Sequence, residues 1–377
     1  MRPSFSLIVL FHSGKGLLKA CIESLKMTIN DNDEVIIVVN SPNSADREVE
    51  FIDSKFRILE FDKALGYSRA ANQGAAAARY DYVVFCDHDL VFKPNWLDEL
   101  WRFYRSQQRL KAVSCCVINP QTNRVLDFGI AYNEFNGAHP HQDLPLSHPL
   151  VQECRTAQAV CTGGLLIAQD DFQQLGGFDE KLMTLYSDVD LSLRIKALGH
   201  NVGSTPKALA YHFGGCFSQI DRSYKQSSIK ADIKGYFTQK NADIMTFDLV
   251  DYYQMSAQHF LSNHNAFGKY FYCNLMNVAN PEWYSDVFEE LGASYYDGVT
   301  WASGHRDSAK EGLYEQLGHD IACLRTPIAY FVDRFCSLEE NVLWWSKRQN
   351  KNDIVIDRNA NILAVEEVIR DRVAQVL

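Results

Sequence analysis

The sequence predicts an α/β fold with a mainly parallel central sheet. Over residues 4–217, short apolar runs alternate with amphipathic stretches, and the links between them are short. One run, residues 35–39, consists only of Val and Ile, which is typical of a strand buried on both faces. An Ala-rich stretch at residues 70–78 favours a helix between two such runs. Strand, helix and strand in this order indicate parallel strands covered by helices.

Each apolar run and each 3.6-period stretch can be assigned in order. We expect strands at residues 6–11, 35–39, 56–61, 82–86, 112–118 and 161–167, and helices at residues 16–27, 70–78 and 187–199. Gly199 suits the left-handed position that follows a helix. The His- and Pro-rich stretch 138–149 predicts a mobile loop.

The length of 377 residues suggests two domains. After residue 218 the pattern changes to aromatic, helix-like stretches at residues 247–261, 283–291, 312–324 and 338–345. We therefore expect a first domain at residues 1–217, a linker at 218–240 and a mostly helical domain at 241–377. The apolar face of residues 365–376 would pack on that domain or on a second copy of the chain.

Composition narrows the class of protein. The net charge of −10 argues against a nucleic-acid partner, because such proteins usually carry a basic face. No apolar run reaches the length that a membrane-spanning helix needs. The ten cysteines form no C-x-x-C pair, which indicates free thiols. We expect a cytoplasmic protein that is at most peripheral at a membrane.

The triplet Asp87-His88-Asp89 is the first candidate site. It follows a buried strand, and open α/β sheets bind ligands at the carboxyl ends of their strands. Two carboxylates two residues apart point to the same side of an extended chain, where a Mg²⁺ or Mn²⁺ ion would relieve their repulsion. Two other Asp-x-Asp triplets occur, so the motif alone also fits carboxylates that cap a loop.

The start of the expected helix at residue 187 has two interpretations. Ser187 and Asp190 have the spacing of a capping box, and the helix dipole favours a carboxylate at Asp188 in any case. Alternatively, Asp188 is a general base, although the dipole should lower its pKa. His212 likewise suits either a buried structural histidine or a ligand.

Together these motifs resemble family 2 glycosyltransferases of the GT-A fold, in particular the rhamnosyltransferase-like bacterial branch. The resemblance covers residues 4–217 and rests on six pieces in the expected order. These are the opening strand with Phe11-His12-Ser13, residues 66–74 (GYSRAANQG), the triplet 87–89, Thr162-Gly163-Gly164, residues 176–180 (GGFDE) followed by 186–194 (YSDVDLSLR), and the late His212.

The resemblance implies inverting transfer of a sugar from a nucleotide-diphosphate sugar, with a divalent cation, Mn²⁺ or Mg²⁺. Asp188 would be the catalytic base, and Asp89, Asp87 and His212 would hold the metal. The residues implied in donor binding are Phe11, His12, Asn40, Gly66, Arg69, Asn72, Asp87, His88, Gly163 and Gly164.

Four positions depart from the family pattern. Asn40 stands where the family usually has an Asp that receives the N–H of the base, so the base of the donor stays open. Ser187 replaces the acidic neighbour of the presumed base. Phe11 and His12 replace a Tyr and an Asn, so a hydroxyl contact to the nucleotide is absent.

The sequence thus predicts a hexosyl- or deoxyhexosyltransferase of surface polysaccharide or glycoconjugate synthesis. Its acceptor would be a carbohydrate, a lipid-linked sugar or a protein, and residues 241–377 would cover the acceptor or join a second copy. A catalytically silent sugar-nucleotide-binding scaffold is an alternative that the changes at Asn40 and Ser187 favour. A sugar nucleotidyltransferase should carry a Gly-rich loop after the first strand, and residues 11–15 are poor in Gly.

Overall fold

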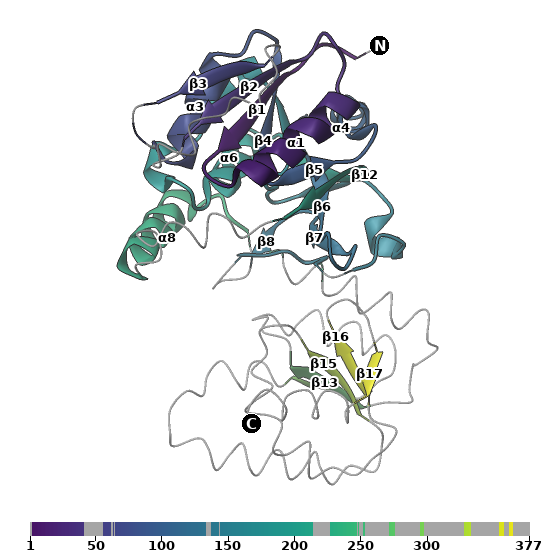
Figure 1. The fold of residues 1–377 in the computed structure, drawn as a ribbon. Coiled ribbons are helices and arrows are strands. Elements are labelled where there is room, and N and C mark those ends of the chain that lie inside the picture. The colour runs from purple at the N-terminus through teal and green to yellow at the C-terminus, as the bar shows by residue number, and fades with distance from the viewer. Residues whose placement is uncertain are drawn as a thin grey trace. The chain divides into compact units, whose positions relative to one another are not determined.

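The computed structural model describes two compact units (Figure 1). The first unit is formed by residues up to 246, and the second by residues 247–377 with the short segment 133–136. The described parts of the chain are residues 2–40, 56–61, 63, 65–132, 137–142, 144–213, 227–246, 248 and 252, and the strands at 271–275, 295–297, 328–332, 354–357 and 362–364. None of the described helices is long and apolar enough to span a membrane.

The first unit is built on a mixed sheet. Its main path runs β10-β12-β6-β11-β4-β1-β2-β3, with β5 paired to β12 and β7 paired to β6. The strands are β1 (Ser6–Phe11), β2 (Glu34–Val39), β3 (Arg57–Glu60), β4 (Tyr82–Asp87), β5 (Leu90–Phe92), β6 (Leu110–Ile118), β7 (Val125–Asp127), β10 (Arg155–Ala157), β11 (Leu165–Ala168) and β12 (Asn201–His212). A separate two-stranded ribbon joins β8 (Ala131–Tyr132) to β9 (Gly137–Ala138).

Helices cover both faces of this sheet, because alternate residues of its strands are apolar on both sides (Figure 1). Helices α1 (Lys15–Thr28) and α4 (Trp96–Tyr104) pack on the face that carries Leu7, Val9 and Ile37. Helices α3 (Tyr67–Ala76), α5 (Gln169–Gln174) and α6 (Ser187–Ala197) pack on the face of Ile8, Ile36 and Phe85. The result is the predicted three-layer α/β arrangement.

The order of the strands differs from their order along the chain. Strands β1, β2, β3 and β4 are parallel, as the sequence predicts, and β6 is parallel to β12. Strand β11 lies between β4 and β6 and is antiparallel to both. This late strand therefore joins the parallel strands β1 to β4 to the parallel pair β6 and β12.

Most of the predicted elements are confirmed within a few residues. The expected strand at 161–167 is shorter and begins at Leu165, after the glycines. The stretch 138–149, expected to be mobile, is partly packed in its described residues: it includes one residue of β9, and His141 and Leu144 are buried. The six cysteines whose side chains are described are free, as expected.

The expected linker at 218–240 is wrong for its second half. Helix α8 (Ser227–Asn241) belongs to the first unit, where Ile233 and Phe237 pack with Val189 and Leu193 of α6 in one apolar cluster. Gln158 then fixes the following chain, because its side-chain amide exchanges hydrogen bonds with the backbone of Thr246 at 2.6 and 2.7 Å. The alternation of apolar residues in α8 is weak, which is why the sequence did not reveal a packed helix.

The second unit contains a sheet that the sequence did not predict, and the expectation of a mostly helical domain stays a prediction. Its strands are β13 (Phe271–Leu275), β14 (Tyr295–Asp297), β15 (Ile328–Val332), β16 (Ile354–Asp357) and β17 (Ile362–Ala364). They form one sheet, parallel except for β17. The helix-like stretches at 247–261, 283–291, 312–324 and 338–345 lie outside the described residues apart from positions 248 and 252, as does the face at 365–376.

Candidate active site

The carboxyl ends of β1, β2 and β4 meet at one edge of the sheet. Leu10 pairs with Asp87, and Phe11 pairs with Val39, so the residues that follow these strands lie next to one another. Strand β11 runs in the opposite direction, with Leu165 opposite Phe85, and this register brings Thr162 and the following glycines to the same edge. The parallel topology thus assembles the sequence motifs at the place where α/β sheets bind ligands.

Asp89 and His212 form a close pair at this edge. Strand β5 pairs antiparallel with the end of β12, so His212 lies opposite Leu90, and the N–H of Phe213 donates to the carbonyl of Asp89. The Nε2 atom of His212 is 3.3 Å from Oδ2 of Asp89. Burial opposes charge on both groups, but their mutual contact outweighs it, lowering the pKa of Asp89 and raising the pKa of His212. Each group of the pair therefore favours the charged form of the other.

Asp87 lies beside this pair, close enough to feel the charges of both groups. Burial, followed by the negative charge of Asp89, raises the pKa of Asp87 to about 7. The Tyr67 hydroxyl lies near Asp87 and Thr162, and its pKa is raised by burial and by the charge of Asp87. This hydroxyl makes no well-aligned hydrogen bond within the described part of the chain.

Asp188 occupies the first turn of α6. The start of α6 is tied to the start of α3, because the hydroxyls of Ser187 and Ser68 are 2.8 Å apart and the Ser68 N–H donates to Met183. Asp188 accepts a hydrogen bond from the N–H of Val189 at 2.9 Å. Even so, burial raises the pKa of Asp188 to about 6. The expected depression by the helix dipole is thus outweighed by burial.

The capping-box interpretation of Ser187 and Asp190 is wrong. The residue before α6 is Tyr186, in the left-handed conformation with φ 62°, and no side chain caps the helix. Asp190 is completely buried and binds Arg194 and Lys240 with its two oxygens. The spacing suggested a capping box, but the carboxylate of Asp190 binds Lys240, which lies far away in the sequence.

Several residues implied in donor binding make contacts with other residues of the protein. Phe11 is fully buried, with its ring edge-on to His88 at 5.3 Å between centroids, and Nδ1 of His88 lies 3.0 Å from the carbonyl of Leu10. The side-chain amide of Asn40 accepts from the N–H of Leu65 and donates to the carbonyl of Gly66. These side chains shape the edge of the sheet from within.

Asn72 also holds the chain together. Its amide donates to the carbonyl of Phe178 and accepts from the N–H of the same residue, both at 2.9 Å. A Cβ at Gly177 would lie 2.6 Å from this amide, which explains the glycine in that motif. Arg69 is the contrasting case, since its exposed guanidinium makes only a surface ion pair with Glu180 at 2.8 Å in the described structure.

Gly163 and Gly164 are required by close packing against β6. A Cβ on Gly163 would lie 2.7 Å from Val117, and one on Gly164 would lie 2.6 Å from Cys115. Gly164 also has φ +77°. The absence of a side chain at these glycines thus lets side chains of β6 approach their backbone closely. Gly66 starts α3 with φ 81°, and buried His12 lies 3.2 Å from the carbonyl of Asn40 through Nδ1.

Sequence reasoning missed two features of this site. Tyr67 belongs to the motif at residues 66–74 but is not among the predicted site residues, although an aromatic hydroxyl following the Gly at a helix start was the available signal. His139 is one of three histidines in the stretch predicted to be a mobile loop, but its Nδ1 lies 2.5 Å from the buried carboxylate of Asp127, and both charges act on Asp188. The other two histidines are also engaged: His141 with Arg155, and His148 with the N–H of Leu150. The structural roles of these histidines follow from their contacts, which the sequence alone does not show.

The donor set at this edge suits a hard divalent cation. The described residues contain no preformed group of three or more His, Cys, Asp or Glu side chains arranged to hold a metal. Mg²⁺ and Mn²⁺ sites of this kind need only one or two protein carboxylates, because substrate phosphates supply further oxygens. Asp89 provides such a carboxylate with His212 beside it, and a bound cation would oppose the burial and the negative charge of Asp89 that raise the pKa of Asp87.

The fold is that of the GT-A glycosyltransferases. The chain is similar in fold to a solved structure described as "Crystal structure of GalNAc-T7 with UDP, GalNAc and Mn2+". The two proteins are 15% identical, the match covers 86% of this chain and 58% of that chain, and the TM-score is 0.51. At this level of identity the likeness concerns the fold alone.

Part of the first unit is similar to proteins of a known enzyme family. Residues 6–144 match the model of the family described as glycosyl transferase family 2. The O-antigen biosynthesis protein RfbC of Myxococcus xanthus is 29% identical over 230 residues, 58% of this chain and 18% of RfbC. The pre-mycofactocin glycosyltransferase of Mycobacterium tuberculosis is 25% identical over 157 residues, 41% of this chain and 32% of the relative. The aligned segments thus span a third or less of these relatives.

Proposed function

We propose that the chain is an inverting, metal-dependent glycosyltransferase that moves a sugar from a nucleotide-diphosphate sugar to an acceptor hydroxyl. The observation that carries this proposal is that the Asp89–His212 pair and Asp188 both lie close enough to Asp87 for their charges to act on it. The relation to RfbC supports an acceptor in polysaccharide synthesis.

Asp188 is the proposed general base. A pKa near 6 leaves the carboxylate ionised at neutral pH, and it is closer to the ideal for proton transfer at that pH than an ordinary aspartate. As the acceptor oxygen forms its bond to the anomeric carbon, the bond to the diphosphate on the opposite face breaks. The hydroxyl proton goes to Asp188, and the nucleoside diphosphate leaves with the bonding electrons.

Asp89 and His212 would hold the divalent cation, with Asp87 beside them. When bound, the cation neutralises charge on the diphosphate of the donor. The Tyr67 hydroxyl, buried between Asp87 and Thr162, is placed to donate to an oxygen of the donor. The other donor contacts that the resemblance implies, among them Arg69, His12 and Gly66, remain proposals.

The test is donor binding by calorimetry across UDP-, GDP-, dTDP- and CMP-linked sugars, with and without Mn²⁺. Wild type is compared with Asp89→Ala and with Asp170→Ala, a control on the exposed side of α5. We expect one donor class to bind, to need Mn²⁺, and to lose at least tenfold in affinity in Asp89→Ala alone.

The remaining outcomes separate the competing functions. Binding without any transfer to an acceptor and without hydrolysis of the donor would favour the silent scaffold. Release of pyrophosphate from a nucleoside triphosphate and a sugar phosphate would favour the nucleotidyltransferase. Absence of binding by every donor would overturn the transferase.

A further inference from the structure

Helix α8 lies outside the family-matched segment 6–144 and beyond the last motif residue, His212. We propose that α8 is part of the catalytic apparatus, with Phe237 and Lys240 as positioning residues that hold the first turn of α6 and therefore Asp188. The inference rests on the proposed function, because it assigns a role through the proposed base.

The first contact of α8 lies just before Asp188 in the chain. The rings of Phe237 and Tyr186 stack with centroids 4.6 Å apart and planes inclined by 14°. Tyr186 is held at φ 62°, which L-residues other than Asn and Asp rarely adopt, and its carbonyl accepts the N–H of Asp190. Such a backbone conformation persists only where its surroundings fix it, and the stacked ring of Phe237 is one of the neighbours that pack against Tyr186.

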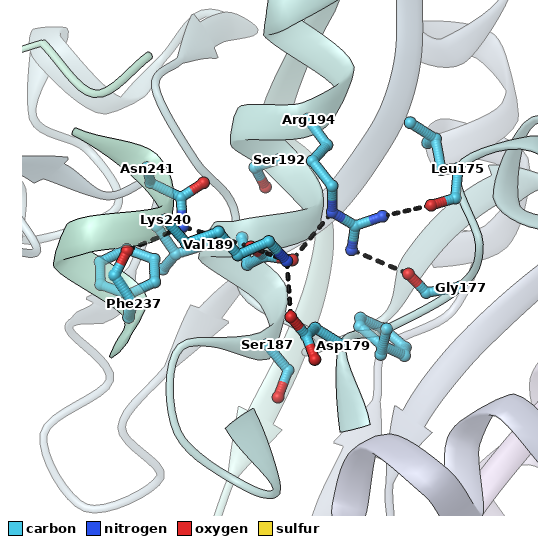
Figure 2. Close-up of polar contacts among 12 residues, drawn as sticks. Leu175, Gly177, Asp179, Ser187, Val189, Ser192, Arg194, Phe237, Lys240 and Asn241 are labelled. Atoms are coloured by element: carbon cyan, nitrogen blue, oxygen red, sulfur yellow. Dashed lines mark hydrogen bonds and ion pairs between the residues drawn. The ribbon is translucent and has the colours of Figure 1, made fainter. Parts of the chain in front are cut away.

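The second contact lies just after Asp188. The Nζ atom of Lys240 is 2.7 Å from Oδ1 of Asp190 and 2.6 Å from Oδ2 of Asp179. The side-chain amide of Asn241 donates to the same oxygen of Asp190 at 3.2 Å. Figure 2 shows Lys240 and Asn241 reaching from α8 towards α6, with Lys240 bonded to Asp179. Helix α8 thus holds the chain on both sides of the proposed base.

Arg194 extends this network to the loop before α6. Its Nε donates to Oδ2 of Asp190 at 2.8 Å, and its two terminal nitrogens donate to the carbonyls of Leu175 and Gly177 at 2.7 and 2.8 Å (Figure 2). Each oxygen of the Asp190 carboxylate therefore has its own cationic partner. The start of α6 is fixed against the same loop that Asn72 clasps.

A purely stabilising role does not explain this placement. Buried ion pairs contribute little net stability, because desolvation of the charges offsets their attraction. Here the network acts on residues 186 and 190, which bracket Asp188, in a helix turn that lacks a side-chain cap. A catalytic carboxylate must be held to within a fraction of an ångström, and a displacement of about 1 Å can cost about a hundredfold in rate.

The test compares Lys240→Met and Lys240→Arg with Lys19→Met, a control at an exposed lysine of α1. Turnover with saturating donor and acceptor, donor affinity and donor KM are measured well below the unfolding temperature. We expect Lys240→Met to lose about ten- to a hundredfold in kcat with donor affinity and donor KM unchanged. Lys240→Arg should recover most of the loss, and Lys19→Met should match wild type.

A double-mutant cycle identifies the route of the effect. If Lys240 acts through Asp190, Lys240→Met should cost at most about twofold more in an Asp190→Asn background. Retained donor affinity shows that each variant is folded. If Asp190→Asn does not fold, Asn241→Leu is measured instead, because it also removes a hydrogen bond to Asp190. We expect a smaller loss of kcat in Asn241→Leu than in Lys240→Met.

Two results would overturn the positioning role: wild-type kcat in Lys240→Met, or an equal loss of kcat whether or not Asp190 is present. Failure of the proposed function looks different. In that case Asp188→Asn would keep wild-type turnover, and the positioning role would fall with it. A loss in Asp188→Asn with normal turnover in Lys240→Met rejects only the role of α8.

Discussion

Two groups of motif residues share one edge of the sheet and differ in how they are satisfied. Asn40 and Asn72 have both ends of their amides bonded to backbone of the protein itself. Asp87 and Asp188 instead carry pKa values raised to about 7 and about 6 by burial. The comparison shows that motif residues of this chain serve two purposes. The amides of Asn40 and Asn72, whose hydrogen bonds are made within the protein, build the site. The carboxylates of Asp87 and Asp188, whose pKa burial raises, remain available for chemistry.

The largest effect should come from the strained group. We expect Asp188→Asn to lower kcat by about 10²–10⁴-fold, because the amide cannot accept the acceptor's proton. Donor affinity should change little. The activity of wild type should fall below about pH 6, as Asp188 gains a proton, and the residual activity of the variant should lack this acid limb. Asp170→Asn is the matched control, and a normal kcat in Asp188→Asn would remove the contrast.

The next effect should come from a satisfied amide. Asn72→Leu leaves the N–H and carbonyl of Phe178 without their partner, which should lower the free energy of unfolding by about 2–4 kcal/mol. Urea titration measures this loss, and Gln73→Leu on the exposed side of the same helix should be near neutral. The pH dependence of kcat in the surviving folded protein should match wild type. A shifted acid limb would place Asn72 with the chemical group instead.

The stability effect of Asp188→Asn should have the opposite sign. The folded pKa of about 6 lies above the ordinary value of 3.8, so ionising Asp188 costs the folded state. The penalty is complete above about pH 7 and absent below about pH 3. Asp188→Asn should therefore raise the free energy of unfolding by about 3 kcal/mol at pH 8, and by almost nothing at pH 3. Urea titrations at the two pH values check this, and a destabilised variant at pH 8 would contradict the strain.

The smallest effect concerns Arg69, which belongs to neither group. Its ion pair with Glu180 is exposed at both ends, so Arg69→Ala should change stability by less than about 1 kcal/mol. As a proposed donor contact, it should still weaken donor binding by about fivefold. Glu180→Gln breaks the same pair but keeps the arginine, and it should bind donor as wild type does. Equal donor affinity in all three proteins would show that Arg69 has only a surface role.

The sequence predicted the layers of the first unit well, because the strand at 35–39 and the helix at 70–78 each have a clear local sequence pattern. It also brought Asp87 and Asp89 to the carboxyl end of a strand. It could not predict which polar side chains are already engaged, since Asn40 finds its partners 25 and 26 residues along the chain. Nor could it predict the raised pKa of Asp188, because burial depends on segments far away in the sequence.

The role of Asp190 shows the same limit more sharply. Its local context is that of a cap, and its partner Lys240 lies in a stretch whose weak apolar pattern predicted a linker. In the second unit the sequence did not predict the strands β13 to β17, which lie outside the stretches predicted as helices. Aromatic residues are common in strands, so their abundance does not distinguish strands from helices.

The position of β11 has a consequence for how the chain reaches its native state. Residues 6–144, the segment that matches the family, contain β4 and β6 but not the strand that lies between them. As the chain emerges from the ribosome, β1 to β4 can pair early, while β6 has to wait for β11 and β12. Until then both strands present open hydrogen-bonding edges, which are the usual starting points for aggregation. The family-matched segment is therefore not a self-sufficient folding unit.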